Sequence, residues 1–483
     1  MKLKSIKLNA FLNSLRSLLS AIFPLITFPY VSRVLSVDGI GKYNFSNSIV
    51  SYFVLIAGLG ISTYAVREGA KYRDNKKQIN RFANEVFTIN VFSAITAYLM
   101  LFICLTIFTK LHSYLACILI YSIQIGFSVL SVDWLFTIYE DFVYITIRSI
   151  LFQIISLVLL FIFVRHSNDY LNYAAITVFS AVGSNLLNFF RAEREHHIHI
   201  VYHFNWKKHL MPILILFAAN IANLIYVNSD ITLLGLMKSN YIVGIYSVSS
   251  RIYSIVKSVL AATLLVTVPR LAVLYGKNKI NRYKMLLSRL VNTLVMLTLP
   301  AMVGLIMLSR QVILIIAGNH FLRSVASLRI LVVAYIFAIL AWVLNDCVLI
   351  PAKREKKVLC SMSISAIINV IFNLLLIRYL SENAAAISTV FAEMSMFAIN
   401  YYFSRDLIGD VFISRKLFIT IIDSSLGCLA IALLCLVINR IFDSLIIITF
   451  LSMLLSIILY ILVLLLLRNQ YILSLLRVKR KCS

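Results

Sequence analysis

The chain of 483 residues is 61% hydrophobic and 13% charged, and it carries a formal net charge of +26. Such a composition excludes a soluble globular protein, because most side chains must face lipid or one another. It also excludes a soluble nucleic-acid-binding protein, since the Lys and Arg residues lie mainly in short segments between apolar runs of membrane-spanning length. We therefore predict an all-α, polytopic integral membrane protein that binds no nucleic acid.

About 14 apolar runs of roughly 20 residues follow one another along the chain, and each is predicted to be a helix because an open sheet could not satisfy its backbone in lipid. The first run lacks a small-residue cleavage site, so we expect it to be a retained helix. The predicted spans are residues 11–35, 42–66, 83–107, 113–138, 142–164, 171–190, 210–236, 243–268, 286–308, 326–350, 359–380, 384–403, 417–439 and 444–467.

The basic residues indicate the orientation of the spans. Most of the 45 Lys and Arg residues lie at the N-terminus, in the even-numbered turns and in the C-terminal tail. The opposite turns hold few, such as Lys110, Arg165, Lys238 and Arg440. Because basic loops stay in the cytoplasm, we expect both termini there.

An internal repeat organises the chain. Shifting the numbering by 203 aligns two stretches without a gap. The matched pairs are Gly41 with Gly244, Tyr43 with Tyr246, Ser46 with Ser249, Ile49 with Ile252, Ser51 with Ser254, Arg67 with Arg270, Tyr72 with Tyr275, Asn75 with Asn278 and Lys76 with Lys279. The copies begin six spans apart, which predicts two lobes of equal orientation. We expect an N-terminal lobe at residues 1–209, a C-terminal lobe at 210–404, and two further helices with a basic tail at 405–483.

Polar side chains enter four of the spans at helical spacing, so that each set shares one face of its helix. These residues include Arg16 in the first span, Asn47 and Ser48 in the second, Asn220, Asn223 and Asp230 in the seventh, and Arg251, Ser254 and Lys257 in the eighth. Ser and Asn can simply bond across helix contacts. Arg16, Arg251 and Lys257 favour a polar cavity between the lobes, because a cation at depth costs several kcal/mol unless it meets water or an acid.

Acidic residues near or within the spans are candidates for coupling transport to a proton or sodium gradient. Asp230 is the first candidate because it lies on a cavity stripe; Asp133 and Glu393 follow. Each could instead be the fixed partner of a nearby base, and the sequence leaves this alternative open.

The sequence contains little that indicates a metal site or a catalytic site. The His residues between 196 and 209 are irregularly spaced in a basic loop, where a solvated face is the better interpretation than a metal cluster. No nucleotide-binding Gly loop or nucleophile elbow is present. We therefore expect no enzyme activity, no metal and no cofactor.

Several segments resemble bacterial polysaccharide flippases of the Wzx type. They include residues 24–35 with two prolines, 39–46, 47–68, the run Asp133-Trp-Leu-Phe136 with Glu140, residues 144–148, 244–247, 269–271, Asn373 and 384–393. The pattern departs at Thr137-Ile138, where relatives often carry Gln-Gly, which puts a tight turn there in doubt.

The resemblance implies two six-helix lobes of the multidrug/oligosaccharidyl-lipid/polysaccharide exporter superfamily, with two extra C-terminal helices. It implies an undecaprenyl-pyrophosphate-linked oligosaccharide, such as an O-antigen repeat unit, moved from the cytoplasmic to the periplasmic leaflet. A polysaccharide polymerase and a chain-length regulator are candidate partners. The alternatives are a cation-coupled multidrug exporter of the same superfamily and, less favoured, a membrane glycan polymerase or transferase.

Overall fold

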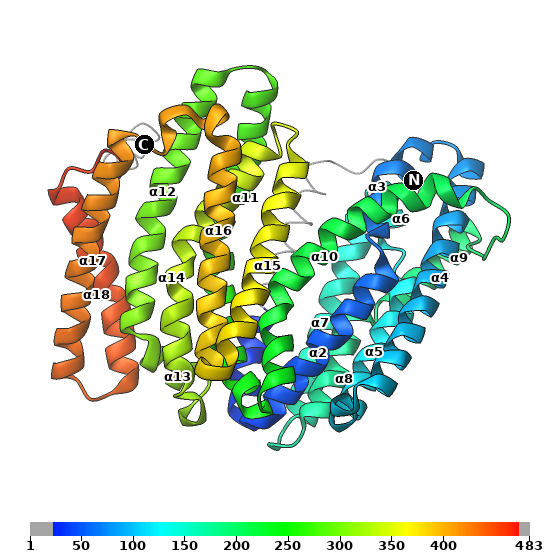
Figure 1. Ribbon diagram of the computed structural model, residues 1–483, viewed down its shortest axis with the longest axis horizontal. Coiled ribbons are helices and arrows are strands. Elements are labelled where there is room, and N and C mark those ends of the chain that lie inside the picture. Colours follow the sequence, from blue (N-terminus) through cyan, green and yellow to red (C-terminus); the bar gives the residue numbers. More distant parts are fainter. Residues whose placement is uncertain (1–22, 473–483) are drawn as a thin grey trace. The chain divides into compact units, whose positions relative to one another are not determined.

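The computed structural model describes residues 23–472, except for the side chains at 262, 263, 265, 266 and 410, and this part of the chain is helical without a strand (Figure 1). Eleven of its helices are long and apolar enough to cross a membrane. Two further helices, α11 (Asn240–Gly276) and α16 (Glu382–Ile408), coincide with the eighth and twelfth predicted spans. The prediction of an all-α polytopic membrane protein is confirmed. The first predicted span lies partly outside the described residues, where only 23–34 are seen as helix.

The chain divides into two compact units, Met1–Gly244 and Ile245–Ser483, and the division falls within α11. The lobe boundaries predicted from the repeat stay a prediction. The helices before α11 are α2 (Val37–Gly58), α3 (Ile61–Gly69), α4 (Lys76–Ile107), α5 (Leu115–Val129), α6 (Asp133–Ile138), α7 (Phe142–Phe163), α8 (Tyr170–Val182), α9 (Asn185–His196) and α10 (Trp206–Met237).

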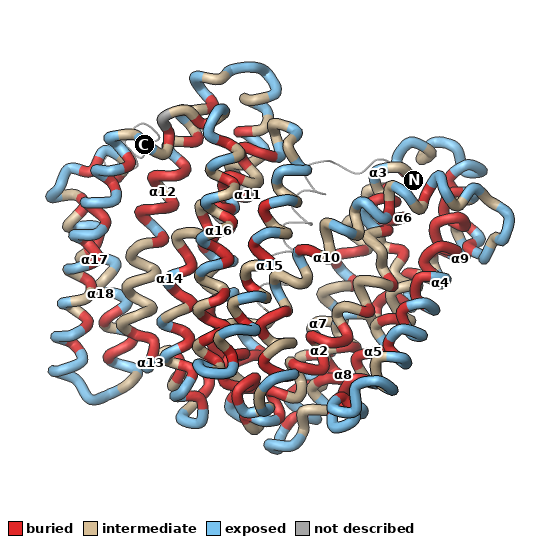
Figure 2. Tube along the Cα trace, in the orientation of Figure 1, coloured by how far each residue is buried: buried red, intermediate tan, exposed pale blue. Residues whose placement is uncertain are grey.

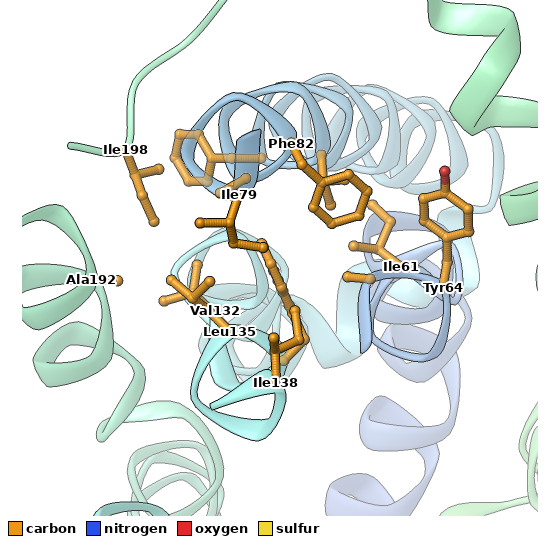
Figure 3. Close-up of a cluster of buried hydrophobic side chains, with 14 of the residues drawn as sticks. Ile61, Tyr64, Ile79, Phe82, Val132, Leu135, Ile138, Ala192 and Ile198 are labelled. Carbon is orange, nitrogen blue, oxygen red and sulfur yellow. The ribbon is translucent and has the colours of Figure 1, made fainter. Parts of the chain in front are cut away.

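In the first unit, α2 is the central helix and packs against α4, α5 and α10. Ser36 caps its start by accepting a bond from the Gly39 amide at 3.1 Å, which satisfies one of the free N–H groups of the first turn. At one end of the unit α3, α4 and α6 enclose a cluster of apolar side chains that includes Ile61, Ile79 and Leu135 (Figure 3). Burial of this cluster fixes the short α6 between α5 and α7.

Thr137 and Ile138, where the sequence put a tight turn in doubt, are the last residues of α6, and a tight turn follows directly at 139–140. Glu140 adopts a left-handed conformation with φ 56°, and the amide of Asp141 donates to the carbonyl of Phe136 at 2.9 Å. A non-glycine residue rarely takes this conformation, so its surroundings must hold it. The Glu140 carboxylate receives a bond from Arg73 at 3.0 Å, which ties the turn to the chain between α3 and α4.

The second unit is built around α14 (Ser324–Val343), which continues through η4 (Leu344–Leu349) and packs against α12 (Ile280–Met307) and α16. In the most apolar stretch of α14 and η4, 67% of the residues are buried inside the protein. In the corresponding stretch of α18 (Leu445–Leu466), 17% are buried (Figure 2). The other helices of the unit are α13 (Ser309–Ile316), α15 (Glu355–Leu380) and α17 (Arg415–Ile441). The pair α17 and α18 packs on α12, so it extends the bundle on one side.

The repeat glycines bring two helix starts into backbone contact. A Cβ atom added at Gly41 would lie 1.9 Å from the carbonyl oxygen of Asn240, and one added at Gly244 would lie 2.1 Å from that of Val37. Val37 and Asn240 are themselves related by the repeat offset, so the contact is reciprocal. Only glycine allows such close approach of two backbones.

Gly41→Ala should therefore destabilise the protein, because the carbonyl of Asn240 is backbone and cannot swing aside. We expect a loss of about 1–3 kcal/mol or more, measured as a lower thermal unfolding midpoint of the purified protein. Gly304→Ala in α12 is the matched control, since nothing lies within 4 Å of its added Cβ. Equal midpoints for the Gly41 and Gly304 variants would contradict the glycine contact.

Candidate functional site

A buried ion pair joins α11 and α16 in the second unit. The Nζ atom of Lys257 lies 2.6 Å from Oε1 of Glu393, and these side chains are 23% and 3% exposed. The hydroxyl of Tyr253 donates to the same oxygen at 3.3 Å, and its ring stacks on Tyr335 of α14 at 4.8 Å. The structure thus joins two residues for which the sequence predicted different roles, substrate binding for Lys257 and coupling for Glu393.

Next to this pair, α11 presents an exposed polar face. Arg251, Ser254 and Ser258 are exposed and lie three and four residues apart, so they form one stripe. The two serine hydroxyls donate to backbone carbonyls of their own helix at 2.8 Å. Arg251 has no acidic partner within ion-pair distance among the described residues. A guanidinium on a spanning helix needs water or an anion beside it, so this face is suited to bind an anion.

In the first unit Ser48 of α2 faces α10. The hydroxyl of Thr232 in α10 lies 3.2 Å from the hydroxyl of Ser48. The hydroxyl of Tyr52 lies 3.3 Å from the same Thr232 hydroxyl. Ser48 is 2% exposed, so it bonds across a helix contact. Asp230 is 6% exposed on the same helix as Thr232 and interacts electrostatically with Tyr52.

The other residues predicted for the site do not form a single cluster among the described residues. Asn47 is half-buried and its carbonyl accepts a bond from Ser51 at 2.6 Å. Asn220 is half-buried beside Gly60, and Asn223 is exposed on α10. Arg16 lies outside the described residues.

Asp133, the second coupling candidate, belongs to an ion pair at one end of the first unit. Its Oδ1 atom accepts a bond from Nη2 of Arg148 at 2.7 Å and another from the side-chain Nδ2 of Asn188. Arg148 is 5% exposed. The ring of Tyr144 lies 5.6 Å from the Arg148 guanidinium and 4.2 Å from that of Arg191. Residues of the segment that resembles the flippases therefore hold α6, α7 and α9 together.

A further buried polar group, around His209 in the first unit, was not predicted from the sequence. Nε2 of His209 lies 2.8 Å from Oε2 of Glu85, and its Nδ1 lies 2.8 Å from the hydroxyl of Tyr64. His209 is 1% exposed, and Arg81 bonds the other oxygen of Glu85 at 3.0 Å. This arrangement ties the start of α10 to α3 and α4.

The interpretation of the His-rich segment as a solvated face is wrong for two of its members, since His196 and His209 are both buried. Nδ1 of His196 lies 2.7 Å from Oδ1 of Asn80, and the amide of His199 donates to Asn84 at 3.2 Å. The polar residues at the start of α4 could have indicated these partners. Within residues 23–472, no group of three or more His, Cys, Asp and Glu side chains could hold a metal ion.

Replacing Asp133 by Asn should destabilise the protein, because Arg148 would remain buried without its counter-ion. We expect a loss of about 3–5 kcal/mol, seen as a lower unfolding midpoint and lower abundance in the membrane. Glu68→Gln is the matched control, since it removes an exposed pair with Lys71 worth about 1 kcal/mol or less. An Asp133→Asn protein as stable as the wild type would contradict the structural role and favour coupling.

Comparison with known proteins places the chain in a family. Residues 6–274 match the profile of the family described as polysaccharide biosynthesis protein. A Shigella dysenteriae protein described as an O-antigen transporter is 21% identical over 379 residues, which cover 77% of this chain and 93% of that protein. One of the same description from Escherichia coli (strain K12) is 27% identical over 170 residues, 34% of this chain and 39% of that protein.

Two solved structures share the fold. The lipid II flippase MurJ in an inward closed conformation has a TM-score of 0.73 at 15% identity, covering 95% of this chain and 99% of that one. An inward-facing multidrug resistance MATE transporter of the MOP superfamily has a TM-score of 0.59 at 14% identity, covering 82% and 99%. With a family match over more than half of its length, the chain belongs to the polysaccharide biosynthesis protein family, and it shares the fold of the MurJ and MATE structures.

Proposed function

We propose that the protein moves an undecaprenyl-pyrophosphate-linked oligosaccharide from the cytoplasmic to the periplasmic leaflet of a bacterial inner membrane by alternating access. The observation that supports this function best is the exposed face of α11, where Arg251 has hydroxyl groups along the same stripe and a lysine at its edge. The relatives described as O-antigen transporters support the same class of substrate.

The chemistry of this face suits a pyrophosphate. An arginine presents a planar fork of donors that matches phosphate oxygens in pairs, and such charge-assisted bonds are among the stronger ones in proteins. The hydroxyls of Ser254 and Ser258 keep acceptor capacity for sugar hydroxyls after donating to the helix backbone. The prenyl chain would stay in lipid throughout.

Lys257 and Glu393 would link binding to a change of state. Lys257 is partly exposed and Glu393 is buried, so a phosphate that approaches Lys257 competes with the carboxylate for its ammonium group. A buried carboxylate that loses its cation is costly unless it gains a proton or another cation. Substrate binding at α11 would thereby favour cation uptake at Glu393.

Both termini would lie in the cytoplasm, as the basic turns indicate. Lobes at residues 1–209 and 210–404, with 405–483 as an added segment, would move against each other around the substrate. The polymerase and chain-length regulator would receive the translocated unit. A multidrug exporter is less suited to this face, because its usually cationic substrates would meet Arg251.

Arg251→Ala should reduce transport of a pyrophosphate-linked glycolipid in reconstituted vesicles by roughly tenfold to a hundredfold, the value of one charge-assisted bond of about 1.5–3 kcal/mol. Arg251→Lys should restore only part of the rate, because an ammonium cannot present the fork. In cells the alanine variant should lose surface glycan while remaining inserted.

The control for Arg251 is Arg289→Ala, which removes another exposed arginine from a spanning helix of the same unit. Its transport rate should match that of the wild type. A normal rate in the Arg251→Ala protein would remove Arg251 from the proposed site, while equal losses in both variants would indicate a general effect of charge.

Asp230→Asn tests coupling to an ion gradient. If Asp230 carries the ion, the variant should keep normal abundance and substrate binding, but its flipping should become insensitive to an imposed proton or sodium gradient. If it only balances a cation, abundance should fall because a buried charge is left unpaired. Gradient-dependent flipping by a normally expressed variant would turn attention to Glu393.

A further inference from the structure

An exposed groove in the second unit combines an apolar floor with one arginine. It has a volume of about 290 Å³ and lies between α14 and α16. Its lining consists of Arg329, Ile330 and Val333 from α14 and of Ile387, Val390 and Phe391 from α16. The spacing within each helix is that of a single helical face. Apart from Arg329 these residues offer no polar side chain, so the groove suits a hydrocarbon chain.

Arg329 is held in place at the edge of this groove. Its Nε atom donates to the hydroxyl of Ser309, the first residue of α13, at 2.8 Å. That bond leaves the two terminal nitrogens available, and no acidic side chain of the described residues pairs with Arg329. Arg329 is nevertheless exposed, on the sixth residue of an apolar spanning helix. A cation at that position needs an anion or water within reach.

An acidic residue at the start of α16 is already engaged by another arginine. Glu382, at the start of α16, receives a bidentate pair of bonds from Arg323, the N-cap of α14, one of them at 3.1 Å. Glu382 is 2% exposed. The pair fastens the two helices at the end from which the groove runs, so the groove walls are fixed before any ligand arrives. Within residues 23–472 no acidic side chain pairs with Arg329, so its charge is available to a ligand.

We propose that this groove is a binding site for an anionic phospholipid of the bilayer, whose phosphate pairs with the terminal nitrogens of Arg329 and whose acyl chain lies along Val333, Val390 and Phe391. A net negative head group is favoured over a zwitterionic one. The ammonium group of a zwitterionic lipid would need an acceptor, and Glu382 is occupied by Arg323. The proposal is independent of which glycolipid the protein moves.

The test places a reporter in the groove. Phe391→Trp is a conservative change, because the ring stacks on Phe372 at 4.7 Å and an indole can do the same. The full-length variant is reconstituted in mixed vesicles of phosphatidylcholine and phosphatidylglycerol, in which either the one lipid or the other has brominated chains. Quenching of the added tryptophan by each brominated lipid is measured after the signal of the parent protein is subtracted. No lipid-linked sugar is present, so any bound lipid is a phospholipid.

We expect phosphatidylglycerol to be preferred over phosphatidylcholine by about fivefold at this position, the effect of one basic side chain near a lipid phosphate. Adding Arg329→Gln should reduce the preference to about one, and Arg329→Lys should keep part of it. Arg440→Gln is the matched control: it removes another exposed arginine at the same end of the unit, where Asn439 bonds Gln311 at 2.8 Å. It should leave the preference unchanged.

Equal quenching by the two lipids in the Phe391→Trp protein would overturn the proposal, and this result does not depend on the folding of any arginine variant. A preference that survives Arg329→Gln would also overturn it, because the selectivity would then come from other basic residues. Should Arg329→Gln fail to fold, Ser309→Ala decides. Releasing Nε should lower the preference, and an unchanged preference would count against a positioned guanidinium.

Discussion

At Gly41 and Gly244 the starts of α2 and α11 approach until a backbone carbonyl of each occupies the space that a side chain of the other would need. The two glycines are related by the internal repeat, and so are the two carbonyls they meet. Other close contacts follow the same demand: an added Cβ at Gly235 of α10 would lie 1.9 Å from the ring of Phe45. In lipid, where burial of apolar surface does not drive helices together, such close packing is a main source of association. The arrangement of α2, α10 and the start of α11 depends on it.

Around this framework most buried ionic groups are compensated within their own unit. Asp133 meets Arg148, Glu85 meets His209, and Glu393 meets Lys257. Each pair joins helices that are distant in sequence, so it contributes to specific packing as well as to charge balance. Isolated charges are costly in a membrane, so an exposed cation on a spanning helix needs water or an anion. Arg251 and Arg329 are two such cations without an acidic partner in the described part of the chain, and we propose an external anion for each.

The two arginines differ in their surroundings. Arg251 shares its helix face with serine hydroxyls, a combination that suits a hydrated glycolipid head group. Arg329 borders a groove whose other lining residues are apolar, a combination that suits the phosphate and chain of one lipid molecule. A fold shared with the MurJ flippase and with a MATE transporter does not distinguish such ligands. The side chains on the shared fold do.

The sequence by itself determined the helices and the repeat. Hydropathy placed the second to the fourteenth spans because a stretch of about 20 apolar residues has no stable alternative to a helix in lipid. The repeat marked Gly41 and Gly244, although not that they would touch the opposite backbone. Only the tertiary structure decided the partners of the polar groups. Helical spacing predicted a polar face on both α2 and α11. In the structure Ser48 is buried against Thr232, while Arg251 is exposed. Lys257 and Glu393, 136 residues apart, and Glu85 and His209, 124 apart, became pairs because of how the helices pack. Periodicity describes one helix at a time, and the position of a neighbouring helix is not encoded in it.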